Sequence, residues 1–204
     1  MNNDQINFEI KRKFFHLCAI FFPLLYIFTT KLNMCILLLT ISSLTLLLDT
    51  YRHSNIKIKE LVDNFFSFMM RNSEKSQANK LSGSSYMAMG LLLSCILFSK
   101  GLAINSWLIL IVSDCFAAII GMRFGNPLYN GKSIEGALAF FVSSVTISVF
   151  SCSIEPYGTN FGIMVFSCIL TTLIEFFSKD LQINDNFSIP LTYGSSVVLL
   201  SLIF

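Results

Sequence analysis

The chain has 204 residues, of which 54% are hydrophobic and 13% are charged, and its formal net charge is +2. Soluble globular domains carry about 25% charged residues, so this chain could not cover a water-exposed surface without large apolar patches. The composition therefore predicts a membrane protein and excludes a cytosolic enzyme, a disordered chain and a nucleic-acid-binding protein.

Seven apolar runs, each uncharged or with a single acid, come close to the length of about 20 apolar residues with which a helix crosses a bilayer. They predict an all-α bundle of about seven transmembrane helices that forms a single domain over 1–204. In chain order the runs cover 14–30, 32–48, 82–99, 102–122, 134–153, 160–177 and 187–204.

The basic residues predict the orientation, because Lys and Arg resist translocation. With seven crossings, all 14 of them except Lys31 and Lys100 fall on the side of the N-terminus. This distribution predicts an integral, multi-pass membrane protein with a cytoplasmic N-terminus, placed in the inner membrane if the cell is bacterial.

The loop 49–81, cytoplasmic in this topology, contains apolar residues that recur at steps of three and four. They are Ile58, Leu61, Val62, Phe65 and Met69. The spacing predicts an amphipathic helix, which lies either at the membrane interface or over the cytoplasmic ends of the bundle.

Six cysteines lie inside apolar runs and show no C-x-x-C spacing. They are Cys18, Cys35, Cys95, Cys115, Cys152 and Cys168. This placement is typical of small buried apolar side chains, so we expect neither disulfides nor metal thiolates.

Ionisable side chains in or beside the apolar runs are informative because a bilayer makes them expensive. In the predicted topology all of them lie on the cytoplasmic surface or within about three helical turns of it. They are Glu9, Lys13, His16, Asp49, Asp114, Arg123, Lys132, Glu135, Glu175 and Asp185. A pore or proton relay would string such groups across the membrane, so the layout indicates chemistry at the cytoplasmic face.

The first group is Glu9, Lys13 and His16, which share one face of a helix, with Glu9 spaced to pair with Lys13. Lys13 could equally be a topological anchor at the membrane boundary. An anchor explains His16 less well, because it lies about a turn inside the run.

Asp114 is the strongest single signal, because ionising it inside an apolar run costs at least a few kcal/mol unless it meets a cation or a metal. Ala118, Gly121 and Gly125 follow on the same helix face. Small residues there allow a ligand or another backbone to approach closely. The alternative is a packing seam with a structurally bonded Asp.

The loop G-N-P-L-Y-N-G-K-S-I-E-G over 125–136 resembles a P-loop, but its glycines are one residue too far apart and an apolar helix precedes it, so the P-loop fold is excluded. Gly131 and Lys132 could still favour an anion, with Ser133 capping a helix whose first turn contains Glu135. An ordinary loop-to-helix junction would explain the same residues.

A third helix junction offers oxygen atoms to the same surface. Glu175 closes the sixth run, and Asp185 and Asn186 open the seventh. Carboxylate and amide oxygens suit Mg²⁺ that is shared with phosphates. A solvated loop explains Asp185 equally well, but not Glu175, which lies in an apolar run.

Five segments together resemble the polyprenol kinase family, which includes dolichol kinase, phytol kinase and the CTP-dependent diacylglycerol kinase. They are E-I-K-R-K-F-F-H (9–16), L-S-G-S-S-Y-M-A-M-G (81–90), S-D-C-F-A-A-I-I-G-M-R-F-G (113–125), G-K-S-I-E-G (131–136) and D-N-F-S-I-P (185–190). The third and fourth segments are the most specific. The membrane cytidylyltransferases are more distantly similar.

The resemblance implies an integral-membrane kinase that phosphorylates a lipid alcohol at the cytoplasmic face, with CTP as donor and Mg²⁺ or another divalent cation. The alcohol could resemble polyprenol or dolichol, phytol or diacylglycerol. The residues themselves do not separate CTP from ATP.

Phosphoryl transfer needs cations on phosphate, a metal held by carboxylates and one base, and the candidates divide accordingly. For phosphate binding we expect Lys13, Gly121, Arg123, Gly125, Gly131, Lys132, Ser133 and Gly136. For the metal we expect Asp114, Glu135, Asp185 and Asn186. The catalytic candidates are Asp114, Lys132, Glu175 and His16, and which of Asp114, Glu175 and His16 is the base stays open.

Two other functions remain as alternatives. A CTP-using cytidylyltransferase would need the same face, metal and nucleotide, but it would release pyrophosphate where the kinase releases CDP. A small transporter would need polar residues on a path to the far side, and the one-sided layout disfavours it.

Overall fold

The computed structural model describes residues 3–52, 81–128, 131–154 and 156–203, and all its regular elements are helices. They are α1 (Asn3–Cys18), α2 (Phe21–Phe28), α3 (Lys31–Tyr51), α6 (Gly83–Leu97), α7 (Lys100–Leu108), the π-helix η1 (Ile109–Ser113), α8 (Asp114–Phe124), α9 (Ile134–Ile154), α10 (Phe161–Phe177) and α11 (Asp185–Ile203). The all-α prediction is confirmed for these residues. The amphipathic helix predicted over 58–69 lies outside them.

Several helices are suited to a bilayer. In the described part of the chain, four are long and apolar enough to cross one: α3, the continuous helix 100–124, α9 and α11. Two shorter apolar helices, α6 and α10, coincide with two more of the predicted runs. These lengths and compositions indicate a membrane protein, while the number of crossings stays a prediction.

The distribution of side chains is inverted relative to a water-soluble protein. Large apolar side chains point outward, with Leu32 of α3 70% exposed and Val142 of α9 60% exposed. The interior instead holds fully buried polar residues, among them Ser94, Asn105 and Ser148. In a lipid bilayer, apolar side chains are expected on the outside of the bundle and small polar residues between the helices.

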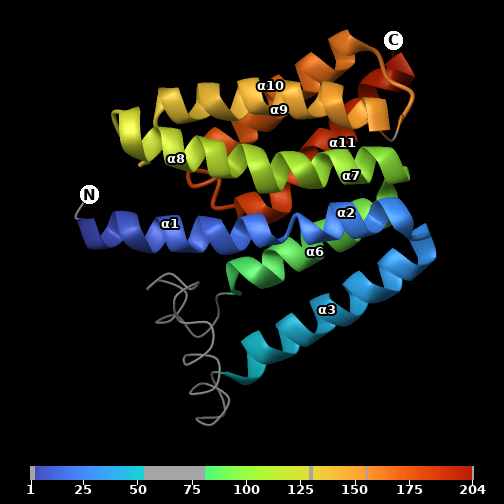
Figure 1. The fold of residues 1–204 in the computed structure, drawn as a ribbon, viewed down its shortest axis with the longest axis horizontal. Helices are drawn as coiled ribbons and strands as arrows, with labels where there is room; N and C mark the ends of the chain where they lie inside the picture. The colour runs from blue at the N-terminus through green and yellow to red at the C-terminus, as the bar shows by residue number, and fades with distance from the viewer. Residues whose placement is uncertain (1–2, 53–80, 129–130, 155, 204) are drawn as a thin grey trace.

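The helix predicted over 14–30 is in fact two helices, and this prediction is wrong. Pro23 has no N–H to donate to the carbonyl of Ala19, and its ring would clash with that carbonyl in a continuous helix. The Ala19 carbonyl instead accepts from the N–H of Phe22 at 2.9 Å, a tighter turn that separates α1 from α2. The chain then continues in nearly the same direction (Figure 1).

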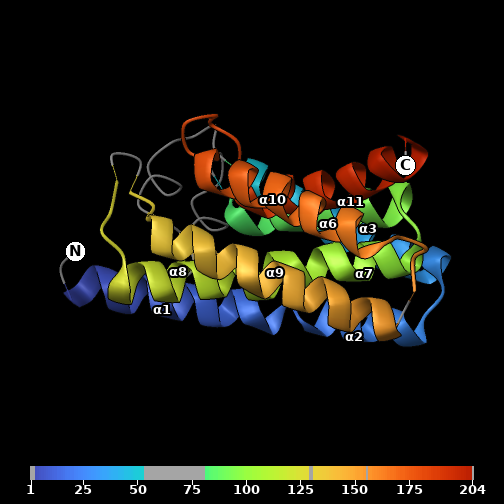
Figure 2. The same cartoon turned by 90° about the horizontal axis from the view of Figure 1, so that it is seen from above.

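The remaining helices surround the continuous helix 100–124. Figure 1 shows α1 and α2 end to end beside it, with α9 and α10 on one side of this pair and α6 and α3 on the other. Seen from above, α11 and α6 lie on the side opposite α1 (Figure 2). The loop from α10 to α11 returns to the end of the bundle where the N-terminus lies, so that α1, α8, α10 and α11 meet there.

At the opposite end, two lysines cap helices. The Lys31 ammonium donates to the carbonyls of Ile96 and Phe98, each at 2.9 Å, at the end of α6. The Lys100 ammonium donates to the carbonyl of Ile27, at 2.8 Å, at the end of α2. A cation at a helix C-terminus satisfies free carbonyls and the helix dipole.

A buried hydrogen-bonded network joins α7, α9, α11 and the loop before α10. The Asn105 side chain donates to the hydroxyls of Tyr157 and Tyr193, and Tyr193 donates to Ser148 at 3.0 Å. Burial raises the pKa of Tyr157 to about 12, so its hydroxyl keeps its proton at physiological pH. These residues show no signal in the sequence, because their polar groups are uncharged and they lie far apart in the chain.

Candidate functional site

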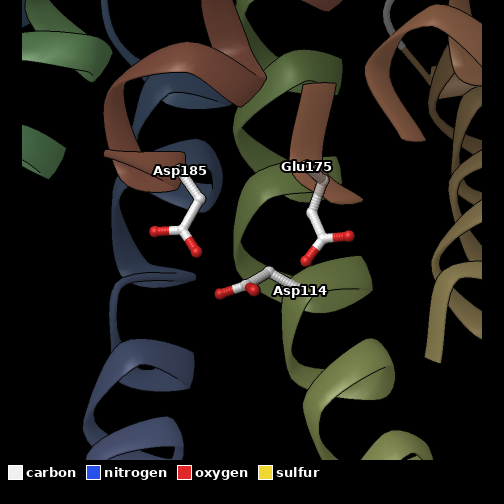
Figure 3. Close-up of side chains that lie close together, drawn as sticks. All are labelled: Asp114, Glu175 and Asp185. Carbon is white, nitrogen blue, oxygen red and sulfur yellow. The ribbon is translucent and has the colours of Figure 1, made fainter. Parts of the chain in front are cut away.

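Three carboxylates converge where these helices meet. Asp114 begins α8, Glu175 lies in the last turn of α10, and Asp185 begins α11. One oxygen from each lies within 4.8 Å of those of the other two, and Figure 3 shows the side chains pointing toward one another. The side chains of Asp114 and Glu175 are 5% and 6% exposed, and that of Asp185 is 25% exposed. We call these three residues the carboxylate group.

Two lysines neutralise most of this charge. The Lys13 ammonium of α1 pairs with Asp114. The Lys132 ammonium pairs with the Glu175 carboxylate, also donates to the Glu175 backbone carbonyl, and lies 3.9 Å from Asp185. Burying an unpaired ion has a large desolvation penalty. The two lysine pairs offset this penalty for Asp114 and Glu175. The five groups together leave one negative charge.

The charged face of α1 differs from the predicted arrangement. Glu9 pairs with Arg12 at 2.8 Å, whereas Lys13, its expected partner, reaches across to Asp114. Lys13 is 7% exposed and is therefore more than an anchor at the membrane boundary. The sequence signal for this contact existed, because an intramembrane Asp requires a cation.

The π-helix η1 ends directly before Asp114. A π-turn widens the helix and changes the directions of the residues that follow it, and such turns are frequent at functional sites. His16 contacts this turn, since its Nε2 lies 3.2 Å from the Leu110 carbonyl oxygen. A carbonyl can only accept, so Nε2 carries the hydrogen, and it also lies 3.6 Å from the Asp114 carboxylate. His16 thus holds the turn that positions Asp114.

The predicted phosphate-binding glycines lie at a close crossing of α8 and α9. Ser133 caps α9, as predicted, by accepting from the N–H of Gly136 at 3.1 Å. Its hydroxyl fills the space beside Gly121 and Gly125, where an added Cβ at Gly125 would lie 2.2 Å from Ser133 Oγ. An added Cβ at Gly136 would lie 2.9 Å from the Ala117 carbonyl. This geometry favours the packing-seam alternative for these glycines.

Two further phosphate candidates lie at the surface. Arg123 is exposed, with its guanidinium 5.4 Å from the centre of the Phe124 ring. It follows Asp114 by about two and a half helical turns, so it faces the opposite way. Gly131 is exposed with φ +73°, a conformation that suits glycine. The structure does not bring Arg123 to the carboxylate group.

The predicted metal ligands are brought together only in part. Asp114 and Asp185 lie in the carboxylate group, but Glu135 lies outside it, and Glu175 supplies the third carboxylate. Asn186 is engaged elsewhere, since its side-chain amide donates to the Gly83 carbonyl at 3.0 Å. The sequence indicated Glu175 as a base because it lies in an apolar run, and the same signal marks it as a ligand.

Asp49, another buried carboxylate, is held by the start of α6. It accepts from the Ser82 N–H at 2.7 Å, the Ser82 hydroxyl at 2.8 Å and the Ser85 hydroxyl at 2.6 Å, and Arg52 lies 3.4 Å away. The three serine contacts fasten α3 to α6, and the Arg52 contact lies at the end of α3 itself. Asp49 therefore joins two helices and is not part of the carboxylate group.

Gly136→Ala is expected to lower the thermal midpoint of the detergent-solubilised protein. The new methyl group meets a backbone oxygen that cannot move cheaply, and overpacking costs about 1 to 3 kcal/mol, against a helix-propensity gain of about 1 kcal/mol. The matched control is Gly162→Ala, where the nearest atom would lie 3.4 Å away and the midpoint should not fall. An unchanged midpoint with lost nucleotide binding for Gly136→Ala would instead place this glycine in a phosphate site.

Fold and site together define a helical protein of membrane type with a buried centre of carboxylates and lysines near one end of its bundle. The chain belongs to the same family as the protein described as "Uncharacterized protein RP860" of Rickettsia prowazekii, with which it is 48% identical over 199 residues, 98% of each chain. It is also 37% identical over 110 residues, 53% of each chain, to "Uncharacterized protein MJ1137" of Methanocaldococcus jannaschii. No family model and no solved structure matches the chain.

Proposed function

We propose that the protein is an integral-membrane kinase that transfers the terminal phosphate of a nucleoside triphosphate, CTP by resemblance, to the hydroxyl group of a lipid alcohol. The carboxylate group is the observation that carries this proposal, because three separate segments bring its acids, and two further segments bring lysines, into a site with little access to water. Phosphoryl transfer depends mainly on such charge neutralisation and positioning.

The donor set of the carboxylate group fits a divalent cation. Mg²⁺ takes oxygen ligands at about 2.0 to 2.1 Å, so adjacent ligands of its octahedral shell lie about 2.9 Å apart and opposite ligands about 4.2 Å apart. Three oxygens within 4.8 Å of one another would share one ion after an inward movement of about 1 Å each. Asp114, Glu175 and Asp185 would hold it, and when bound it would neutralise charge on the transferred phosphate.

The other polar residues have distinct roles in this proposal. Lys132 lies beside Glu175 and Asp185 and supplies positive charge for the phosphates. Lys13 and His16 are positioning residues, since Lys13 holds the Asp114 carboxylate and His16 holds the turn before it. The N–H of His16 donates to a carbonyl and its Nδ1 keeps a lone pair, so Asp114, Glu175 and His16 all remain candidates that accept the proton of the attacking hydroxyl.

We also propose that the chain crosses the membrane seven times, with its N-terminus and the carboxylate group toward the cytoplasm. The capping contacts of Lys31 and Lys100 support this orientation, because they give a structural reason for two basic residues on the opposite side. Asp180→Cys, in a chain without its native cysteines, should react with membrane-impermeant thiol reagents only from the cytoplasmic side. Labelling from outside would contradict the orientation.

The kinase assay uses the purified protein in detergent with Mg²⁺ and a panel of polyprenol, phytol and diacylglycerol. With CTP or ATP labelled in the γ-phosphate, the expected product is a labelled lipid phosphate that disappears when the divalent cation is chelated. In a second assay, with CTP labelled in the α-phosphate and a phosphorylated lipid as acceptor, transfer of label with release of pyrophosphate would instead indicate a cytidylyltransferase. If no acceptor becomes labelled from the γ-phosphate or from the α-phosphate, the proposal is contradicted.

A further inference from the structure

Two thiols are in contact between α3 and α6. Cys35 lies in the second turn of α3 and is partly buried, and Cys95 lies in the last turn of α6 and is fully buried. Their sulfur atoms are 3.3 Å apart. Neither residue belongs to the carboxylate group or to the proposed kinase chemistry.

The other buried thiols have different neighbours. Cys115 contacts the Lys13 carbonyl, and Cys168 contacts the Ser148 hydroxyl, each at 3.5 Å. A disulfide needs sulfur atoms about 2.05 Å apart, so Cys35 and Cys95 would have to approach by roughly 1.3 Å. Small side-chain rotations on two packed helices can supply that movement.

A positive charge lies next to this pair. Lys31 precedes Cys35 by four residues, which places both on one face of α3. Its ammonium donates to the carbonyls of Ile96 and Phe98, at the end of α6 directly after Cys95. Lys31 thus holds the start of α3 against the end of α6, beside the two thiols.

We propose that Cys35 and Cys95 form a reversible disulfide that fastens the start of α3 to the end of α6. Asp49 already fastens the other end of α3 to α6 through Ser82 and Ser85. The disulfide would therefore fix α3 at both ends. The expectation from sequence that no disulfide forms is revised for this pair, which is 60 residues apart in the chain.

The oxidant is itself a disulfide, either oxidised glutathione or the active-site disulfide of a thiol oxidoreductase. The Cys35 thiolate attacks one sulfur of the oxidant and forms a mixed disulfide, while the other sulfur leaves as a thiolate. The Cys95 thiolate then attacks the Cys35 sulfur and displaces the remaining oxidant sulfur. Two electrons pass to the oxidant, and the two thiol protons end on its two released thiolates.

The position of the pair suits this chemistry. The start of α3 and the end of α6 lie at the end of the bundle opposite the N-terminus (Figure 1). In the orientation proposed above, that end faces the side of the membrane away from the cytoplasm. Disulfides persist on that side. Formation of the bond in purified protein requires neither that orientation nor kinase activity.

The test counts free thiols in the purified full-length protein. Protein equilibrated with oxidised glutathione is quenched in acid, denatured, alkylated and examined by mass spectrometry. Alkylated cysteines should fall from six to four, peptides containing Cys35 and Cys95 should be linked, and dithiothreitol should restore six. The oxidised protein should also melt several degrees higher than the reduced protein.

Matched variants make the result specific. Cys35→Ala should keep all five of its remaining thiols or carry glutathione alone, whereas Cys152→Ser should still lose two. Retention of six free thiols in the wild type, or loss of two in Cys35→Ala, would overturn the proposal. Because Cys35→Ala should keep wild-type kinase turnover, failure of the disulfide and failure of the kinase assay are separate results.

Discussion

Asp114→Asn is expected to reduce lipid phosphorylation by at least about 10²-fold, the effect of losing one electrostatic contact to a transferring group in a dehydrated site. Asparagine keeps the shape of the side chain but removes the charge that would hold a divalent cation. Turnover at a series of Mg²⁺ concentrations measures the effect. Near-normal turnover at low Mg²⁺ would show that Asp114 is structural.

This variant needs two controls because Asp114 also pairs with Lys13. Asparagine leaves a buried ammonium without its partner, which can cost about 3 to 5 kcal/mol of stability. In the double variant Lys13→Gln, Asp114→Asn the unpaired charge is gone, so its thermal midpoint should recover while its turnover stays low. Asp180→Asn, a change at an exposed carboxylate, should keep wild-type turnover.

Lys132→Ala is the second change with a large expected effect, again about 10²-fold or more in turnover. The ammonium contacts Glu175 and lies 3.9 Å from Asp185, so its loss removes positive charge from the centre of the proposed site. As a mere anchor it would matter little, because the other basic residues still fix the orientation. Steady-state kinetics with nucleotide and lipid varied separately measure the loss.

Two further lysine variants define the role. Lys132→Arg keeps the charge without the compact ammonium, so partial rescue would indicate charge stabilisation, and lack of rescue would indicate a pocket limited in size. Lys179→Ala changes an exposed lysine near the same turn and serves as the matched control. If Lys132→Ala stays within about twofold of the wild type, under roughly 0.5 kcal/mol, the site is misplaced.

Much of the fold follows from hydrophobic runs alone. The runs 134–153 and 160–177 match α9 and α10 closely, because an apolar run bounded by polar residues marks both the element and its ends. The first run fails for a local reason: Pro23 breaks the helix, and a count of charges does not detect it. The π-turn before Asp114 likewise leaves no mark in composition.

The sequence predicts those residues of the site whose burial in an apolar run is energetically costly. Asp114, Lys132 and Glu175 stand out as ionisable residues in or beside apolar runs, and the structure brings them together. The sequence indicates that Asp114 needs a cation but does not say which one, because Lys13 and Asp114 are 101 residues apart and only the tertiary fold joins them. Gly121 and Gly136 were ambiguous because close packing and phosphate binding both require small residues.

The two lysine pairs of the carboxylate group also have an order in the chain. Lys13 precedes Asp114, and Lys132 precedes both Glu175 and Asp185. During synthesis, each acid is therefore translated after the cation that will neutralise it. Asp114 lies within the continuous helix 100–124, and a lone carboxylate at the centre of a helix that crosses a bilayer costs about 2.5 to 3.5 kcal/mol. In the topology proposed above, Lys13 would already be in place when Asp114 is inserted and would lower that cost.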